Sequence, residues 1–438
     1  MTGAGKTMYH GPNSPNNYTG NFEGGMKRLT LTEWEQKYIV RAIERFDQKY
    51  TMFKRPSWDS QINDSLKDWS FIGEVKQKPG YTMEDQALRW ASRRGTQIDL
   101  FNTSKPNPSR VSKAIAVAIA SPKQDIQALR YKPPEGAKID VSDGQRITRD
   151  IKKVATYFGA DLVGVCKLDR RWVYSHTYEV EGPSGPGGSE AAMGESKPQE
   201  IPEEFQYAVV MGFEEDYAMI KYFPTYVADA ATSMGYSRMA ITNAHLSAFI
   251  RNLGFKAIDC STNDVALSIP MAMQAGLGDL GRHGLLITPQ FGPRVRLSKV
   301  ITDLPLVADA PIEFGLTEFC TTCKKCVEMC PSQSIMPGER TAERVNVSNV
   351  AGELKWPINA ETCRMYWARG NKPCTICIAC CPYNKPSTWF HRLVFWATDH
   401  FRWADSFCVK MDDLLGYGKP KQADKFWEEW QPKRGKFT

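Results

Sequence analysis

The sequence predicts an α+β protein in which a sheet-containing core precedes a cysteine-rich region. Strand-like and helix-like segments alternate between residues 143 and 310, a pattern typical of helices packed around one sheet. Two strings of cysteines follow. The chain has 438 residues, 42% of them hydrophobic, which is enough for two or three cores. We therefore divide it into a wrapping or capping region (1–142), the core (143–310), the cysteine-rich region (311–385) and an aromatic-rich tail packed on the core (386–438).

The spacing of apolar residues is less regular in the N-terminal region (1–142) than in the rest of the chain. Residues 1–25 are rich in Gly, Asn, Pro and Ser and predict an extended, wrapping arm. Apolar residues at helical spacing predict a helix over residues 31–50, whereas residues 51–140 show no clean period. The helical positions are Leu31, Trp34, Tyr38, Ala42 and Phe46.

The core has clearer elements. Apolar residues from Ile147 to Phe158 form one helix face, Gly159 closes that helix, and a strand is predicted at 161–166. The other predicted elements are a polar, glycine-rich surface loop inserted at 182–200, a strand at 207–212, a helix at 224–253 and an extended segment at 255–258.

The cysteine strings carry the most specific chemical signal. The first is Cys320-x2-Cys323-x2-Cys326-x3-Cys330-Pro331, which has the ligand spacing of a bacterial two-cluster ferredoxin. The second is Cys363-x10-Cys374-x2-Cys377-x3-Cys381-Pro382, in which the ten-residue gap is expected to loop out. Two such strings predict two [4Fe–4S] clusters and therefore one-electron transfer.

The spacing also assigns the ligands. Three closely spaced thiolates hold one cluster, and the fourth, after a three-residue gap, reaches the other. Cys380 competes with Cys381, but the gap and the following proline favour Cys381. Zinc and disulfides are the competing interpretations, and cysteines at this spacing fit both poorly. The predicted sets are Cys320, Cys323, Cys326 and Cys381 for one cluster, and Cys363, Cys374, Cys377 and Cys330 for the other.

Charge and hydropathy limit the classes of partner. The net charge of +7 is mild and basic residues are interleaved with acidic ones, so we expect no nucleic-acid partner. No run of about eighteen apolar residues exists, so no transmembrane helix is predicted. The start of the chain is small and polar, without a cleavable signal.

A glycine-rich segment ahead of the cysteines carries a resemblance to a known family. Residues 261–307 include the run Gly276-Leu-Gly278-Asp-Leu-Gly281-Arg282-His283-Gly284. Together with the cysteine strings, this segment resembles the corrinoid-dependent reductive dehalogenases of the respiratory type, over about residues 145–390. The resemblance implies a nitroreductase-like α/β/α corrinoid-binding core followed by a two-cluster ferredoxin-like domain.

Two alternatives are kept beside this resemblance. Epoxyqueuosine reductase, which acts on tRNA, has a similar core and two-cluster region but lacks a long N-terminal part like residues 1–140. A ferredoxin-like electron carrier is the non-enzyme alternative, although a carrier would not need so long a segment ahead of its cysteines.

The resemblance implies a base-off corrinoid, of the cobalamin or norpseudo-cobalamin type, with no histidine ligand on the cobalt. Glycines would let the backbone approach a large flat ring, and His283, which glycines flank, would pack under the macrocycle. The residues expected at the corrinoid are Gly276, Gly278, Gly281, His283 and Gly284.

The resemblance also implies catalytic residues. Tyr236, in Gly235-Tyr236-Ser237-Arg238-Met239, matches the family's tyrosine acid, which donates the proton that replaces the halogen. Arg296 would stabilise the phenolate. Arg294 is the competing choice, because side chains at i and i+2 on a strand point the same way. Asn263 is expected to hydrogen-bond the substrate or the tyrosine.

The implied reaction is reductive dehalogenation of a small organohalide, with a chlorinated alkane or alkene favoured and an arene left open. Trp367 and Thr232 are expected in the substrate pocket. Electrons would pass from a respiratory donor through the clusters to cobalt. A small integral-membrane protein would anchor the enzyme at the outer face of the cytoplasmic membrane after twin-arginine export, the signal being absent from this chain. A homodimer is left open.

Overall fold

A computed structural model describes residues 26–66, 74–93, 136, 138–179, 194–370, 374–386 and 389–431. The arm expected at 1–25 lies outside these residues, as does most of the loop expected at 182–200. The described part contains helices, strands and irregular connections, which agrees with the predicted α+β class.

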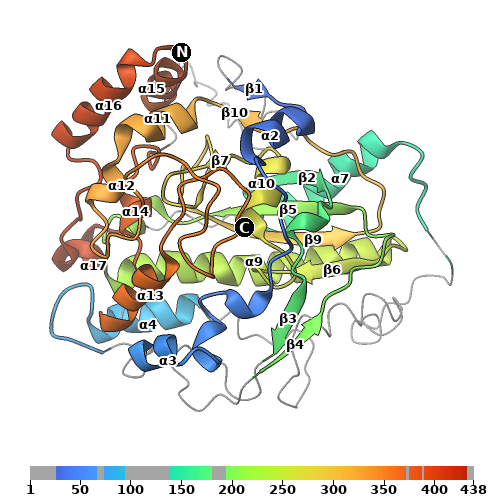
Figure 1. Cartoon of the computed structure of the whole chain (residues 1–438). Helices are drawn as coiled ribbons and strands as arrows, with labels where there is room; N and C mark the ends of the chain where they lie inside the picture. Colours follow the sequence, from blue (N-terminus) through green and yellow to red (C-terminus); the bar gives the residue numbers. More distant parts are fainter. Residues whose placement is uncertain are drawn as a thin grey trace, which may run out of the picture.

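The core is a four-stranded antiparallel sheet in the order β2-β5-β9-β6 (Figure 1). The strands predicted at 161–166 and 207–212 are confirmed, and the one expected from residue 255 begins two residues later. Smaller antiparallel pairs surround the sheet. The strands are β2 (Leu162–Lys167), β5 (Tyr207–Glu214), β9 (Val295–Thr302) and β6 (Ala257–Cys260), and the smaller pairs are β1 (Lys27–Arg28) with β10 (Ile312–Glu313), β3 (His176–Glu179) with β4 (Glu195–Pro198), and β7 (Asp279–Leu280) with β8 (Leu286–Ile287).

One face of the sheet is covered by α7 (Gly144–Tyr157) and the long α9 (Tyr226–Asn252), both of which were predicted. Ile151 of α7 and Leu246 of α9 pack with Val209 and Val300 of the sheet in one buried cluster. The burial of such a cluster is the main source of stability for the core. This face carries the candidate tyrosine, because Tyr236 lies in α9.

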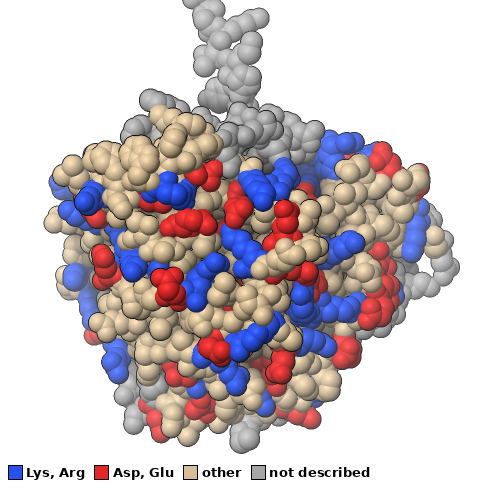
Figure 2. Space-filling model, turned by 45° about the horizontal axis from the view of Figure 1, so that its top comes forward, with Lys and Arg blue, Asp and Glu red and all other residues tan. Residues whose placement is uncertain are grey.

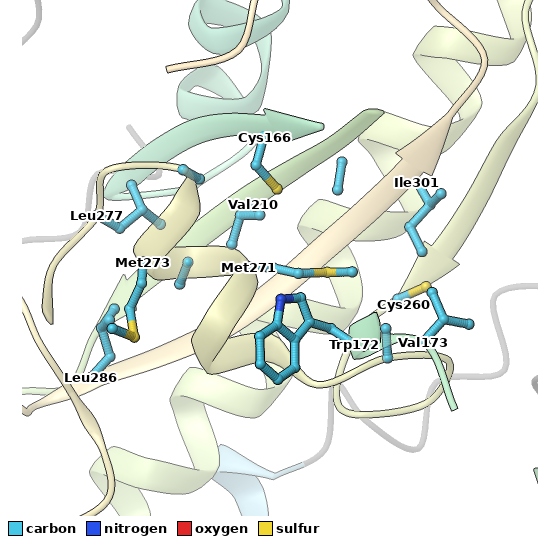
Figure 3. Packing of buried hydrophobic residues seen from close by; sticks show 14 of the residues in the cluster. Cys166, Trp172, Val173, Val210, Cys260, Met271, Met273, Leu277, Leu286 and Ile301 are labelled. Atoms are coloured by element: carbon cyan, nitrogen blue, oxygen red, sulfur yellow. The ribbon is translucent and has the colours of Figure 1, made fainter. Parts of the chain in front are cut away.

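The opposite face is covered by α10 (Ser268–Gln274) and α2 (Leu31–Tyr38). Figure 3 shows Met271 of α10 beside Trp172, with Cys166 and Val210 from the strands beneath the helix. Helices on both faces therefore enclose the sheet in three layers.

The helix expected over residues 31–50 is wrong beyond Tyr38. The capping box at Thr30 starts α2, and Ile39 then takes an extended conformation. The amides of Val40 and Arg41 donate to the carbonyl oxygen of Gly352, so a distant segment replaces the helical hydrogen bonds. The later elements of this region are the 3-10 helices η1 (Gln48–Tyr50) and η2 (Arg55–Ser57), α3 (Ser60–Leu66) and α4 (Met83–Ser92).

Two irregular stretches expected from the sequence are partly regular. The end of the 182–200 segment forms β4, because its backbone pairs with β3. The gap after Cys363, expected to loop out, continues as a helix to Arg369, and Asn359 caps the start of that helix. Short helices connect the core: η4 (Arg170–Trp172) and α8 (Tyr217–Ile220).

The cysteine-rich region is made of short helices that precede a helical tail. Phe426 of the tail is fully buried against Ile220 and Tyr222, whereas Trp403 is 75% exposed. The tail thus packs on the core at one end and exposes aromatic side chains at the other. The helices are α11 (Leu316–Cys323), α12 (Lys325–Glu328), α13 (Ala360–Arg369), α14 (Ile376–Ala379), α15 (Trp389–His400), α16 (Trp403–Leu414), η5 (Ala423–Lys425) and α17 (Phe426–Glu429).

Candidate active site

Tyr236 and Arg296 meet where α9 lies on β9. The guanidinium carbon of Arg296 is 5.3 Å from the centre of the Tyr236 ring. The Nε of Arg296 donates to Glu215, whose side chain is fully buried. Burial lowers the pKa of Arg296, but the charge of Glu215 and the nearby Tyr236 raise it above its ordinary value. The site therefore holds a permanent cation against the face of a phenol.

Gly235 makes this approach of helix and strand feasible. A Cβ at position 235 would lie 2.9 Å from Cγ and 3.5 Å from Cβ of Arg296. Both are atoms near the backbone of β9, which cannot move aside as a flexible side-chain end could. The glycine next to the candidate acid thus determines how closely α9 approaches Arg296.

Arg294 and Arg296, which strand alternation could not separate, have different neighbours. Arg294 forms an ion pair with Glu214 at 3.0 Å. It also donates to the carbonyl oxygen of Lys385 at 2.9 Å, beyond the second cysteine string. Arg294 therefore links the core to the cysteine-rich region, whereas Arg296 lies at Tyr236.

A second arginine, which the sequence reasoning missed, lies near Tyr236. The guanidinium carbon of Arg93, at the end of α4, is 5.7 Å from the Tyr236 ring centre, and burial lowers the pKa of Arg93. Helix α4 runs beside α9, and a buried ion pair between Arg89 and Asp229 connects them (Figure 1). The segment around Arg93 has no clean period, so no sequence pattern indicated it.

Other predicted pocket residues are buried polar groups. Thr232 lies one helical turn before Tyr236, so the two side chains share a face of α9. Trp367, in α13, lies with its ring centre 5.6 Å from the guanidinium carbon of Arg364. Within the described ranges, the Oγ1 of Thr232, the Nε1 of Trp367 and the Oε2 of Glu215 have no hydrogen-bond partner. Buried groups of this kind are where a bound molecule is expected to supply the missing partner.

Asn263 is not brought to Tyr236. Its Oδ1 accepts hydrogen bonds from the backbone amide of Ser268 at 3.0 Å and from the Ser268 hydroxyl at 2.7 Å. Ser268 begins α10, on the face of the sheet opposite α9. In this structure Asn263 therefore orders the start of α10, and its hydrogen bond to the substrate or the tyrosine stays a prediction.

The glycines predicted at the corrinoid have close neighbours inside the protein. A Cβ on Gly276 would lie 2.5 Å from the oxygen of Ala310, and one on Gly278 would lie 2.2 Å from the oxygen of Ile287. A Cβ on Gly281 or Gly284 would lie 2.6 Å from Ile287 or Ile358, respectively. Gly276 and Gly278 thus lie against backbone, Gly281 and Gly284 lie against side chains, and the contact of these glycines with a ring stays a prediction.

The structure gathers the first predicted set of cysteines around a cavity. Cys320, Cys323, Cys326 and Cys381 line it together with Arg282 and His283. The empty volume between the lining residues is about 310 Å³, including space open to solvent. Burial raises the pKa of the Cys381 thiol, and the nearby Cys320, Cys323 and Cys326 raise it further. His283 therefore lines the cysteine cavity, and its packing under the macrocycle stays a prediction.

The second predicted set is also brought together. Burial raises the pKa of Cys377, and its neighbours Cys374, Cys363 and Cys330 raise it further. The pKa of Cys330 is lowered, because hydrogen bonds from Ser332 and Ser334 outweigh the effect of burial. The two sets adjoin, since Cys377 also acts on the pKa of Cys326.

None of the twelve cysteines forms a disulfide in the structure. Cys380 is buried, and its Sγ lies 3.8 Å from the carbonyl oxygen of Cys377. Among the residues that the structure describes, no three His, Cys, Asp or Glu side chains are close enough together to hold a single metal ion.

Comparison of the sequence with known proteins identifies a family. No protein-family model matches the chain. A tetrachloroethene reductive dehalogenase from Sulfurospirillum multivorans is 39% identical over 314 residues, which cover 68% of this chain and 62% of the relative. Over the matched residues, this chain belongs to the reductive dehalogenase family. A tetrachloroethene reductive dehalogenase from Desulfitobacterium hafniense is 35% identical over 330 residues, covering 69% of this chain and 59% of the relative.

The fold agrees with this assignment. A solved reductive dehalogenase structure, which suggests a mechanism for B12-dependent dehalogenation, superposes with a TM-score of 0.67 at 23% identity. The match covers 93% of this chain and 50% of that protein. An epoxyqueuosine reductase from Lactococcus garvieae is 28% identical over 27% of this chain. The chain spans about three fifths of the length of the curated dehalogenases cited above.

The surface offers two further observations on partners. No helix in the described part of the chain is long and apolar enough to cross a membrane. On the face drawn in Figure 2, basic and acidic side chains are interleaved and do not form a continuous basic groove. On that face, positive and negative side chains are therefore mixed.

Proposed function

We propose that this protein is an enzyme that removes a halogen from a small organohalide, using a corrinoid and two [4Fe–4S] clusters. The observation that carries the proposal is the contact of Tyr236 with Arg296, 5.3 Å from guanidinium carbon to ring centre, in a chain that also groups eight cysteines into two sets. The family of the matched residues supports it.

The two cysteine sets fit iron–sulfur clusters. Their cysteines are buried or partly buried, and burial raises the pKa of Cys320 and of Cys363 to about 12. A thiol of this kind loses its proton when a metal binds it, because the cation offsets the buried negative charge. Cys320, Cys323, Cys326 and Cys381 would hold one cluster, and Cys330, Cys363, Cys374 and Cys377 the other.

The site around Tyr236 fits a bound molecule with polar edges. Thr232, on the face of α9 that Tyr236 shares, and Glu215, the partner of Arg296, each present a buried polar atom that lacks a partner in the described structure. Trp367 of α13 also has an unpartnered buried Nε1, and its place in the substrate pocket stays part of the proposal. A bound corrinoid supplies low-potential cobalt chemistry. We propose a corrinoid in the base-off form, of the cobalamin or norpseudo-cobalamin type, with no histidine ligand on cobalt. His283, the histidine of the glycine-rich segment, lines the cysteine cavity and is not the proposed ligand.

Tyr236 is the proposed proton donor. An ordinary phenol has a pKa of about 10 and stays protonated at neutral pH. Arg296 would stabilise the phenolate that remains after the proton leaves. The reaction balances when the carbon–halogen bond breaks, two electrons are taken up, a carbon–hydrogen bond forms with the tyrosine proton, and halide departs. Clusters held by the two cysteine sets would supply the electrons one at a time. Solvent then returns a proton to the phenolate.

The substrate and location follow from the relatives as proposals. The relatives are named for tetrachloroethene, so a chlorinated alkene or alkane is the proposed substrate. Respiratory electrons and a small integral-membrane anchor protein at the outer face of the cytoplasmic membrane complete the proposal. Exposed apolar side chains of α15 and α16, among them Leu393, Trp403 and Phe407, offer a surface for such an attachment.

The experiment loads the purified chain with iron, sulfide and a corrinoid, and measures bound metal and released halide. We expect about eight iron per chain, one cobalt, and chloride release from tetrachloroethene or a chlorinated ethane. Full metal content without halide release from any chlorinated alkane, alkene or phenol would contradict the proposal. Reduction of epoxyqueuosine in tRNA by the same protein would favour the alternative enzyme.

A pair of cysteine variants tests the ligand assignment. Cys381→Ala should lose one cluster, because its thiol lines the cavity of the first set. Cys380→Ala should keep both clusters, since Cys380 does not line that cavity. Equal iron content in the two variants, or the reverse order, would show that the assignment is wrong.

A further inference from the structure

His283 lies in a turn that reaches from the core into the first cysteine set. The turn joins β7 to β8, and its backbone closes through a hydrogen bond from Gly281 to Leu285 of 3.0 Å and one from Gly284 to Gly281 of 2.9 Å. Gly284 has a φ of +73°, a conformation that L side chains rarely adopt. The backbone thus holds the imidazole in one place.

One ring nitrogen of His283 already has a partner. The backbone amide of Leu285 donates to Nδ1 at 3.2 Å, so Nδ1 carries no proton. The proton of a neutral imidazole is then on Nε2, which becomes a hydrogen-bond donor. Burial lowers the pKa of His283 to about 4, which keeps the ring neutral near pH 7.

The other nitrogen has no acceptor within the described part of the protein. Nε2 is buried and unpaired, and the side chain is 5% exposed. His283 lines the cavity formed by Cys320, Cys323, Cys326 and Cys381. A buried N–H without an acceptor is energetically unfavourable. The contents of the cavity are the natural place for the missing acceptor.

Arg282 adds a charge at the same position. Its Nε donates to the carbonyl oxygen of Cys320 at 2.9 Å, and one terminal nitrogen donates to the carbonyl oxygens of Met336 at 2.8 Å and Gly338 at 3.0 Å. The side chain is 1% exposed and lies over the Trp356 ring at 4.3 Å. The hydrogen-bond partners are neutral carbonyls. Cys320, Cys326 and Cys323 act on the charge of Arg282 together with the carboxylate of Glu339, so part of the positive charge is felt at the cysteines.

We propose that Nε2–H of His283 donates a hydrogen bond to a sulfur of the cluster held by Cys320, Cys323, Cys326 and Cys381, and that this bond, beside the charge of Arg282, raises the reduction potential of that cluster. Hydrogen bonds to sulfur and nearby positive charge both stabilise the reduced, more negative state. The inference rests on the cluster content of the proposed function. It does not depend on dehalogenation.

The test compares reduction potentials in the iron-loaded full chain by EPR-monitored titration. His283→Phe keeps an aromatic ring but removes the donor, so the potential of one cluster should become more negative while the other stays unchanged. His283→Gln restores a donor and should bring the potential part of the way back. His245→Phe, at an exposed histidine on α9, is the matched control and should change neither potential.

A second measurement covers the case in which His283→Phe fails to assemble its clusters. Pulsed EPR of the reduced wild-type chain, labelled with ¹⁵N-histidine, should show coupling between one cluster and a histidine nitrogen, and an exchangeable proton. Absence of this coupling, or unchanged potentials in a loaded His283→Phe, overturns the inference. Shifted potentials in a chain without halide release would retain the inference and contradict the proposed function. A wild-type chain that assembles no cluster overturns both.

Discussion

Arg296 and Arg282 have opposite surroundings, although each lies beside a group proposed to take part in electron or proton transfer. Arg296 lies against Tyr236 and donates to the buried carboxylate of Glu215. Arg282 lies among the cysteines and donates to backbone carbonyls. A carboxylate offsets most of the charge of its partner, whereas carbonyl dipoles offset less. An arginine can thus stabilise the phenolate of a proton donor at one site, as Arg296 would, and provide a fixed positive charge at another, as Arg282 would.

The largest expected effect is at the tyrosine. Tyr236→Phe should lower turnover by about 10²–10⁴-fold, the usual contribution of a positioned general acid. Iron and cobalt content should be unchanged, because Tyr236 belongs to neither cysteine set. Tyr157→Phe, at a tyrosine that is 84% exposed, is the control for loss of a hydroxyl. Wild-type halide release in Tyr236→Phe would remove the tyrosine from the mechanism.

The next largest effect is expected for the ion pair of Arg296 and Glu215. Arg296→Gln leaves the fully buried Glu215 without its charged partner, which should lower the free energy of unfolding by about 3 kcal/mol. Turnover should fall as well, because the phenolate of Tyr236 loses its cation. Urea unfolding and halide release measure the two effects. The exposed pair of Arg146 and Asp150, 3.7 Å apart, gives the control, since Arg146→Gln should cost about 1 kcal/mol or less. Equal losses in the two variants would contradict the role of the buried pair.

A smaller effect comes from the spacing of helix and strand. Gly235→Ala places a methyl group 2.9 Å from Cγ of Arg296, so Arg296 or α9 must shift. Overpacking of this kind costs about 1–3 kcal/mol, and we expect turnover to fall about tenfold, as for a loss of roughly 1.4 kcal/mol in the transition state. Gly338→Ala, where a Cβ would meet nothing within 4 Å, is the matched control. If both variants retain full turnover, the close approach at Gly235 has no part in catalysis.

The second cation at Tyr236 should matter less. Arg93 lies farther from the ring than Arg296 does, at 5.7 Å against 5.3 Å. Arg93→Gln should therefore lower turnover only a few-fold and leave the cluster potentials unchanged. Arg149→Gln, at an exposed arginine of α7, controls for loss of one positive charge. A loss as large as that of Arg296→Gln would reverse the order of the two arginines.

The smallest effect on turnover is expected at the exposed aromatic side chains of α16. Replacing Trp403 and Phe407 by Ser should leave halide release unchanged, because both side chains are mostly exposed and neither belongs to a cysteine set. Stability should change by about 0.5 kcal/mol or less. Binding to membrane vesicles that contain the proposed anchor protein should weaken in a sedimentation assay. Unaltered binding would show that the attachment uses another surface.

The parts of the fold that follow from local pattern were predictable. The helix before Gly159 has a regular apolar period, β5 is a short continuous apolar run, and α9 is a long segment that ends before Gly254; each was found. The grouping of cysteines was also predictable, because short spacings in one string restrict which thiolates can meet. The end of α2 at Tyr38 was not, since Gly352, far along the chain, supplies the acceptor that ends the helix pattern.

In the candidate site, too, some residues were predictable from local sequence and others depended on tertiary contacts. The motif around Tyr236 and the two candidate arginines could be read from the chain, but spacing alone left Arg294 and Arg296 equivalent. Packing separates them, because α9 lies over Arg296 while the segment after Cys381 lies over Arg294. The proximity of Arg93 to Tyr236, the place of Asn263 at α10 and the exposure of His283 to the cysteine cavity depend on contacts between distant segments, which no local period encodes.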